Sequence, residues 1–366
     1  MDTSAECSLA MRSTRPTYLP RWRKISMTTD TRTLAESKGN APHPRIDRAP
    51  WWHLLSPRRI SAVYLLVAII VLFTLWAPST FPHMDTARQI LNANAIIGLA
   101  ALALCVPLAT RVFDLSFAFT MSLSGVVAAH MVVGGKPVWA AVLVALLVAA
   151  AIGLVNAFVV IVLGVESLIA TLGTGSLIQA LIIVVTKEES IQGTQLGEGF
   201  AEIGQGQLFG VTLPVIYVLL AAIVLWYVLE HTPLGRKLYA TGFNAEAARL
   251  AGVPTTRLQF YSLIVSATVA GWAGIVLASI LSSGSPTAGT PYLLPAFAAA
   301  FLGATQLKMG RFNAWGTVIA VIALGTGTTG LALAAAPPWS ADVFTGVVLI
   351  TALAMTAAHE KRQRKH

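Results

Sequence analysis

The stretch VWAAVLVALLVAAAIGLVNAFVVIVL, residues 138–163, contains no charged residue and a single amide side chain, Asn156. As a helix it is about 39 Å long, which is enough to cross a hydrocarbon core of ~30 Å. The run lacks the alternation of polar and apolar residues that marks a strand of a membrane β-barrel. It therefore predicts a transmembrane helix.

Nine further apolar runs surround this stretch in a chain that is 55% hydrophobic and 11% charged, whereas soluble domains are about 25% charged. Within all ten runs, only Asp114 and Asp342 carry a charge. We predict an all-α integral membrane protein with about ten transmembrane helices. The run 293–307 is short, about 22 Å as a helix, and predicts a broken or re-entrant segment. The ten runs lie at 60–80, 90–108, 113–133, 138–163, 167–186, 211–229, 258–281, 293–307, 312–334 and 341–358.

The basic residues between the runs predict the orientation of the chain. With the N-terminus inside, eleven Lys and Arg beyond the N-terminal tail fall on the inner side, against Arg88, Lys136 and Lys187 outside. Positive charge favours the cytoplasmic side of a membrane, so we expect both termini to be cytoplasmic in a bacterial inner membrane. Anchoring beside anionic lipid accounts for the net charge of +9 without a nucleic-acid partner.

The chain divides into a membrane domain with two tails. Residues 1–59 are rich in Pro, Ser, Thr and Arg without apolar periodicity, which predicts a disordered basic tail. Met27 is an alternative start of translation within it. Residues 60–358 form the membrane domain with a cytoplasmic loop at 231–257, and 359–366 form a short basic tail.

Motifs for nucleotide, metal or covalent chemistry are absent from the sequence. GTGTTG at 325–330 matches a dinucleotide-binding pattern, but it lies in the ninth apolar run without a preceding strand, so close helix packing is the better interpretation. There is no Walker A motif, no GxSxG and no HExxH, and the two cysteines predict no disulfide framework. We expect no cofactor and no catalytic activity, and the energy source must lie on another chain.

A compact polar segment interrupts the apolar runs at GRKLYATGFNAEAARLAGVPTTR, residues 235–257. Asn244 is a suitable N-cap, Glu246 and Arg249 are spaced to pair, and Gly252 suits the end of a helix. The segment predicts a helix at 245–251. So short a helix is not stable alone in water, so it docks either on its own bundle as a connector or on a partner. Its apolar side consists of Phe243, Ala247, Leu250 and Ala251.

With the three residues that follow it, LQF, this loop resembles the cytoplasmic loop of permease subunits of ribose-type sugar ABC importers. The resemblance spans about residues 88–358. Ala118, two residues after the serine of DLS, stands where the family often has glycine, which could alter packing or substrate choice. Other similar segments are NANAIIGLAALAL (92–104), FDLSFAFTMSLSGVVAA (113–129), GLVNAFVV (153–160), SLIATLGTGSLIQA (167–180), PAFAAAFLGATQLKMGRFNAWGT (295–317) and GLAL (330–333).

The resemblance implies an ABC importer permease bundle in which two copies, in a homodimer, form a pathway for a sugar. It also implies that ATP-binding cassette subunits dock on the cytoplasmic side and that an extracytoplasmic solute-binding protein delivers the substrate. The loop helix would be the coupling helix that contacts the cassette. By similarity, its contact residues are Gly242, Asn244, Glu246, Ala247, Arg249 and Leu250.

Polar residues inside apolar runs are candidates for the translocation pathway. Serine and threonine can instead bond the backbone of their own helix. Asp114 has a specific structural alternative, since it could cap a helix that starts at Leu115 and pair with Arg111. The outer loop at 187–210, with net charge −3, could meet the binding protein or only solvent. The candidates are Asn94, Asp114, Ser116, Asn156, Thr171, Thr174 and Gln179.

Other classes of membrane protein remain open from the sequence. A secondary transporter more often places coupling carboxylates in mid-membrane, and Asp114 alone is weak support for one. A membrane enzyme requires a catalytic cluster, and none is visible. Within the importer interpretation, a branched-chain amino-acid or nucleoside permease of the same superfamily is the alternative.

Overall fold

The computed structural model describes residues 61–197, 199–208, 210–307 and 310–363. The predicted N-terminal tail, 1–59, and the last three residues lie outside them. Each of the ten predicted apolar runs contains a helix. The helices are α1 (Ser61–Trp76), α2 (Met84–Ala109), α3 (Phe117–Val133), α4 (Val138–Ala157), α5 (Ser167–Thr186), α6 (Glu202–Gln205), α7 (Leu213–Trp226), α8 (Pro233–Phe243), α9 (Ala245–Leu250), α10 (Thr255–Leu281), α11 (Leu293–Ala304), α12 (Ala314–Leu333) and α13 (Trp339–Gln363).

Six of these helical stretches are long and apolar enough to cross a membrane: Met84–Ala109, Val138–Val162, Ser167–Thr186, Leu213–His231, Thr255–Leu281 and Ala314–Leu333. Four shorter apolar helices accompany them: Tyr64–Trp76, Phe117–Val133, Thr290–Ala304 and Trp339–Met355. Two of the six end in a π-helical turn, η3 (Phe158–Val162) after α4 and η5 (Tyr227–His231) after α7. The all-α class is confirmed at the level of a helical membrane protein.

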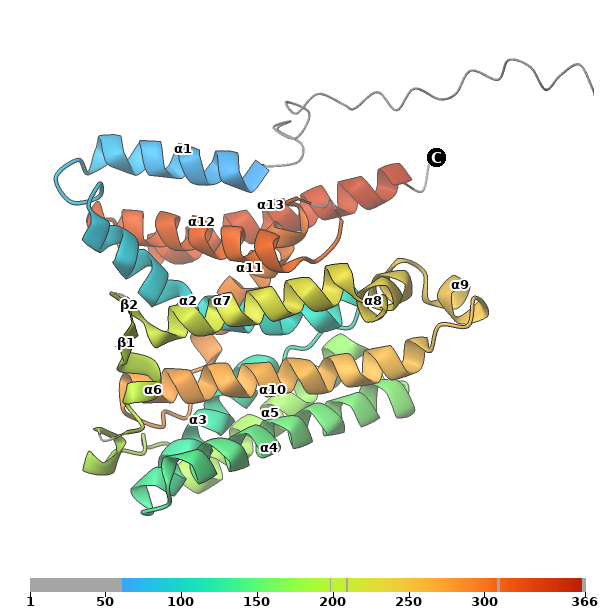
Figure 1. The fold of residues 1–366 in the computed structure, drawn as a ribbon, viewed down its shortest axis with the longest axis horizontal. Helices are drawn as coiled ribbons and strands as arrows, with labels where there is room; N and C mark the ends of the chain where they lie inside the picture. The colour runs from blue at the N-terminus through green and yellow to red at the C-terminus, as the bar shows by residue number, and fades with distance from the viewer. Residues whose placement is uncertain (1–60, 198, 209, 308–309, 364–366) are drawn as a thin grey trace, which may run out of the picture. The chain divides into compact units, whose positions relative to one another are not determined.

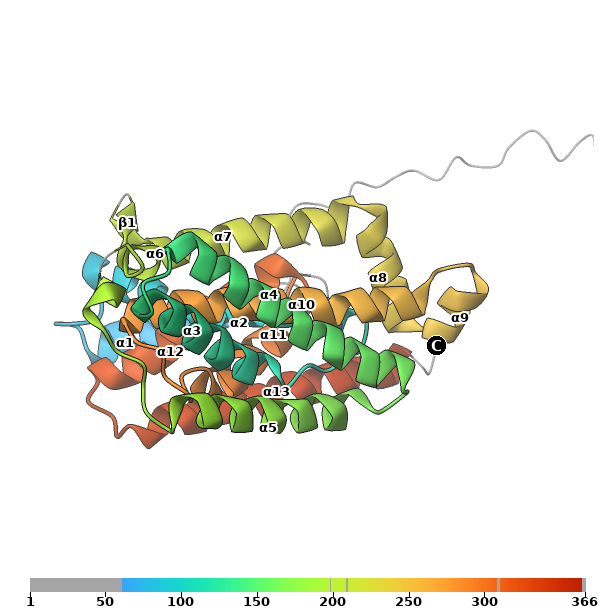
Figure 2. The same cartoon turned by 90° about the horizontal axis from the view of Figure 1, so that it is seen from below.

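Two long, mostly buried helices form the centre of the bundle. α2 packs on α7, α10, α11 and α12, whereas α10 packs on α3 and α4. The two helices run in opposite directions (Figures 1 and 2). Figure 2 shows α5 and α13 on the face opposite α7, and Figure 1 shows that they lie at opposite sides of that face. In both α2–α5 and α10–α13, a long helix is followed by a non-helical segment, a short helix and two longer ones. Such internal repetition is common in transporter folds.

Small residues allow the central helices to approach closely. A Cβ on Gly153 of α4 would lie 2.7 Å from Ile264 Cα of α10, and one on Gly274 of α10 would collide with the Met121 carbonyl of α3. The glycines of GTGTTG in α12 face Asn94, Phe344 and Phe73 from three other helices. This confirms that the motif serves helix packing.

The two ends of the bundle are distinct. At one end lies α9 with its flanking loop, which we call the loop end. At the other, the hairpin end, the outer loop folds into short elements: η4 (Thr194–Gly197), α6, and strands β1 (Gln207–Leu208) and β2 (Val211–Thr212), which pair antiparallel (Figure 1).

Candidate functional site

A non-helical segment, Thr110–Ser116, separates α2 from α3 inside the bundle. The predicted apolar run at 113–133 therefore begins four residues before its helix, because α3 begins at Phe117. Hydroxyl groups of α5 accept hydrogen bonds from backbone amides of this segment, which have no partners within a helix. The Phe113 amide donates to Ser167 Oγ at 3.2 Å, and the Leu115 amide donates to Thr171 Oγ1 at 3.0 Å. Non-helical backbone at membrane depth needs such partners.

Asp114 is fully buried at the centre of this segment. Its Oδ1 accepts hydrogen bonds from the Ser116 amide at 3.1 Å and the Ser116 hydroxyl at 2.7 Å, and its Oδ2 accepts one from Ser266 Oγ of α10 at 2.8 Å. The carboxylate thus closes a local turn instead of capping a helix that starts at Leu115. The Arg111 side chain, the predicted ionic partner, is exposed.

The network continues from Ser116 into α4 and α5. Asn156 Nδ2 donates to Ser116 Oγ at 2.6 Å, and Thr174 Oγ1 donates to Asn156 Oδ1 at 2.5 Å. Five sequence-predicted residues therefore belong to one cluster, which we call the crossing network: Asp114, Ser116, Asn156, Thr171 and Thr174. Asp114, Ser116, Asn156 and Thr171 have zero exposure in the single chain, whereas Thr174 is partly exposed, so the network holds the non-helical segment mainly through buried side chains.

Two further serines bond the same segment and were missed by the sequence interpretation: Ser266 donates to Asp114, and Ser167 accepts from the Phe113 amide. Each is a serine in or beside an apolar run, where bonding to the helix's own backbone is the ordinary role. No local signal distinguishes a serine that bonds a carboxylate 152 residues away. Only the packing of α10 and α5 around Thr110–Ser116 identifies them.

The other two pathway candidates lie apart from the network. Asn94 donates to the Ile90 carbonyl of its own helix at 2.8 Å and lies against Gly325 of α12. Gln179 of α5 donates to the Pro286 carbonyl at 3.4 Å, while its Oε1 is buried and has no hydrogen-bond partner among the described residues. Asn94 thus has a packing role, whereas Gln179 retains a free acceptor.

The loop helix α9 forms as its sequence predicts. Asn244 Oδ1 accepts the Ala247 amide at 3.0 Å, Glu246 and Arg249 form an ion pair at 2.7 Å, and Gly252 has φ 82° just after the helix. The helix ends at Leu250, one residue before the predicted end. Leu250 is 80% exposed and Ala247 is also exposed, whereas Ala248 is buried against the bundle.

The loop is attached firmly to the bundle beneath it. The Tyr239 hydroxyl donates to the Phe312 carbonyl at 2.7 Å, and the Arg311 guanidinium lies over the rings of Tyr239 and Phe243 at 5.4 and 5.1 Å. Burial raises the pKa of the Tyr239 phenol, which keeps it a hydrogen-bond donor. These contacts join α8 to the connection between α11 and α12.

Gly242 has a different position from its neighbours in the motif. It is buried, and a Cβ there would collide with the Ala109 carbonyl at the end of α2. The close approach of α8 and α2 therefore requires glycine at this position. The exposed surface of the motif consists of Asn244, Glu246, Ala247, Arg249 and Leu250.

Comparison with known proteins identifies the family of the chain. A family model described as branched-chain amino acid transport system / permease component matches residues 86–353. The chain belongs to this permease family. The permease is 32% identical over 288 residues to the ribose import permease protein of Bacillus subtilis, covering 79% of this chain and 89% of the relative.

Further relatives have similar coverage. The ribose import permease protein of Escherichia coli K12 is 33% identical over 295 residues, which is 80% of this chain and 91% of the relative. The L-arabinose transport system permease protein of the same strain is 31% identical over 303 residues, which is 82% of this chain and 92% of the relative. No solved structure matches the permease.

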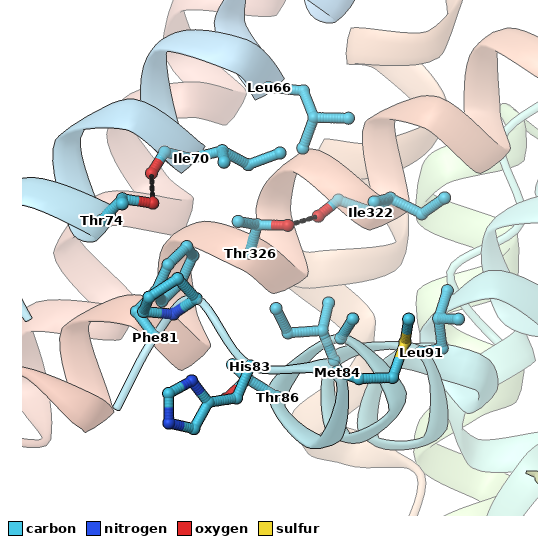
Figure 3. A pocket seen from close by; sticks show the side chains of 13 residues that line it. Leu66, Ile70, Thr74, Phe81, His83, Met84, Thr86, Leu91, Ile322 and Thr326 are labelled. Carbon is cyan, nitrogen blue, oxygen red and sulfur yellow. Dashed lines mark hydrogen bonds between the residues drawn. The ribbon is translucent and has the colours of Figure 1, made fainter. Parts of the chain in front are cut away.

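A cavity of about 470 Å³ lies where α1 and α12 meet the start of α2. Its wall is mostly apolar, and the Thr74 and Thr326 hydroxyls on it bond carbonyls of their own helices at 2.7 and 2.6 Å (Figure 3). None of the pathway candidates lines it, so in the permease this cavity is separate from the crossing network. The lining residues are Leu66, Ile70, Thr74, Phe81, Pro82, His83, Met84, Thr86, Ala87, Ile90, Leu91, Ile322 and Thr326.

Proposed function

We propose that this permease is the transmembrane subunit of an ATP-binding-cassette importer for a ribose-like monosaccharide or related polyol. The supporting observation is the similarity, over about four-fifths of the chain, to permeases named for ribose and L-arabinose. The family description names branched-chain amino acids, so an amino-acid substrate is the alternative. The sugar is favoured because all of these relatives are sugar permeases by name.

The proposed ATP-driven partner docks at the loop end. α9 presents Leu250 and Ala247 to solvent while Ala248 holds the helix to the bundle, and an exposed leucine beside an ion pair suits a small protein contact. The chain has no Walker A motif, so a separate cassette subunit would hydrolyse ATP and this subunit would be non-catalytic. Tyr239 and Arg311 then carry movement of the loop to α11 and α12.

The proposed topology has ten spans with both termini cytoplasmic. Six helices meet the length of a membrane crossing. The short helices α3 and α11 follow the non-helical segments Thr110–Ser116 and Ser282–Gly289, respectively. Each short helix, together with the segment before it, would complete one crossing. α1 and α13 supply the remaining two.

A second copy of the permease would complete the pathway. α5 and α13 lie on one face of the bundle (Figure 2), and both expose apolar side chains, among them Leu177 at 73% and Ile350 at 69%. We propose a homodimer across this face. Each permease chain has one loop helix and would bind one cassette, so two cassettes require two permease chains. An extracytoplasmic binding protein would dock at the hairpin end, where Glu188, Glu189 and Glu202 face solvent.

Transport by the reconstituted complex tests the function. The permease, its cassette and its binding protein are placed in liposomes, and ATP-dependent uptake is measured for D-ribose, L-arabinose, D-allose and L-leucine. We expect accumulation of at least one sugar and none of leucine. Accumulation of leucine alone would contradict the sugar assignment, and uptake without the cassette or ATP would indicate a secondary transporter.

A further inference from the structure

The segment Ser282–Gly289 enters the bundle from the hairpin end without forming a helix. Gly284 pairs with Ile191 through two backbone hydrogen bonds, of 3.0 and 2.9 Å, and lies against Ala129 near the end of α3. Gly289 lies against Ala118 near the beginning of α3. Ala129 and Ala118 are about 16 Å apart along the helix, so the segment reaches deep into the membrane domain.

Close packing fixes this segment on α3 and α5. The Gly289 amide donates to Ser122 Oγ of α3 at 2.9 Å, and a Cβ on Gly289 would collide with the Ala118 carbonyl. On the other side, Gln179 Nε2 of α5 donates to the Pro286 carbonyl at 3.4 Å. The backbone on either side of Thr287 is therefore held in place.

Two threonines at the deep end of the segment are exposed. The residues Thr287 and Thr290 are exposed in the single chain, and within the described residues neither hydroxyl has a hydrogen-bond partner. Threonines in the helices differ: Thr186, Thr326 and Thr351 each bond the carbonyl four residues earlier, at 2.6 to 2.8 Å. The turn geometry at Thr287 and Thr290 removes this option.

Gln179 positions the backbone at the same place. Its amide nitrogen donates to the Pro286 carbonyl, one residue from Thr287, while its Oε1 is buried and has no partner in the described part of the chain. Polar groups without partners are costly in lipid, and those inside a membrane domain face an aqueous path or a ligand. The exposed groups are the two threonine hydroxyls, each of which can donate and accept a hydrogen bond.

We propose that Thr287 and Thr290, on a segment that Gln179 holds in position, form a contact for the hydroxyl groups of the transported sugar, in the half of the pathway nearer the hairpin end. The proposal rests on the proposed function. Few and neutral groups suit a site through which a solute passes, because binding must remain weak enough for release. Each fits a sugar hydroxyl, and none fits the carboxylate of an amino acid, which requires a cation or oriented amides.

The test uses Thr287→Val, Thr290→Val, their combination, and Gln179→Leu in the reconstituted complex, with radiolabelled D-ribose, L-arabinose and D-allose as probes. Thr74→Val in α1 is the matched control, because the Thr74 hydroxyl bonds the Ile70 carbonyl of its own helix at 2.7 Å and α1 belongs to none of the proposed contacts. Each lost hydrogen bond should lower the initial uptake rate at low sugar concentration about two- to tenfold. ATP hydrolysis stimulated by the loaded binding protein should fall less, and Thr74→Val should match the parent.

The outcomes separate the two proposals. Failure of the unmodified complex to transport any of the three sugars refutes the proposed function. Uptake by the unmodified complex that the variants leave unchanged refutes only the hydroxyl contact. If a variant loses uptake and its solubilised complex also has the mass of a single permease chain, these side chains belong to the contact between the two copies. This result would also overturn the inference.

Discussion

Leu250→Asp places a carboxylate at a position of α9 that is 80% exposed in the single chain. Because nothing covers this side chain, the substitution should change the free energy of unfolding of the permease by no more than about 0.5 kcal/mol. In a complex with a cassette subunit the same position becomes buried. The variant therefore separates folding of the permease from binding of its partner.

The exposed fraction of Leu250 sets an upper limit on its contribution to the free energy of cassette binding. Burying a whole leucine side chain contributes about 1.5–3 kcal/mol, so burying the 80% that is exposed would contribute about 1.2–2.4 kcal/mol. Leu250→Ala should then weaken cassette binding by about 8- to 60-fold at most. Leu250→Asp adds the desolvation of an unpaired carboxylate, which costs several kcal/mol more, and should reduce sugar uptake to background.

The assay measures co-purification of the cassette with the permease, ATP hydrolysis and sugar uptake. Leu208→Asp is the matched control, since Leu208 is 47% exposed in β1 at the opposite end of the bundle and should leave cassette binding intact. Normal uptake by Leu250→Asp with a full complement of cassette would mean that α9 is only a connector. In that case the importer proposal would lose its main mechanical support.

Three further predictions address topology, assembly and the crossing network. Cysteines at Ser190 and Thr256, both exposed, should differ in whole cells toward an impermeant reagent, and only Ser190→Cys should react; labelling of Thr256→Cys from outside would refute the ten-span topology. The mass of the solubilised complex should include two permease chains, and an active particle with one chain would refute the homodimer. Asp114→Ala removes the acceptor of three hydrogen bonds and should cost about 1–3 kcal/mol for each group left unsatisfied. It should lower the midpoint of thermal unfolding in detergent, whereas the exposed control Asp342→Ala should not; equal midpoints would contradict a structural role for the network.

The sequence by itself determined the class of the protein and the loop helix. Apolar runs long enough to span a membrane and without the alternation of a barrel strand predict helices, because a helix satisfies its own backbone in lipid. α9 was also predictable to within one residue, since its determinants are local: Asn244 bonds an amide three residues away, and Gly252 adopts a positive φ. Such signals lie within one turn of the residues they affect.

The tertiary structure decided where the helices break and which polar residues meet. The run 113–133 contains no residue that forbids a helix, yet its first residues are non-helical because α5 and α10 supply hydroxyls to Phe113, Asp114 and Leu115. Thr287 and Thr290 likewise read as ordinary turn residues, and their depth in the bundle follows only from the packing of Gly284 and Gly289 on α3. Partners up to 152 residues apart leave no local pattern, so only the folded chain reveals them.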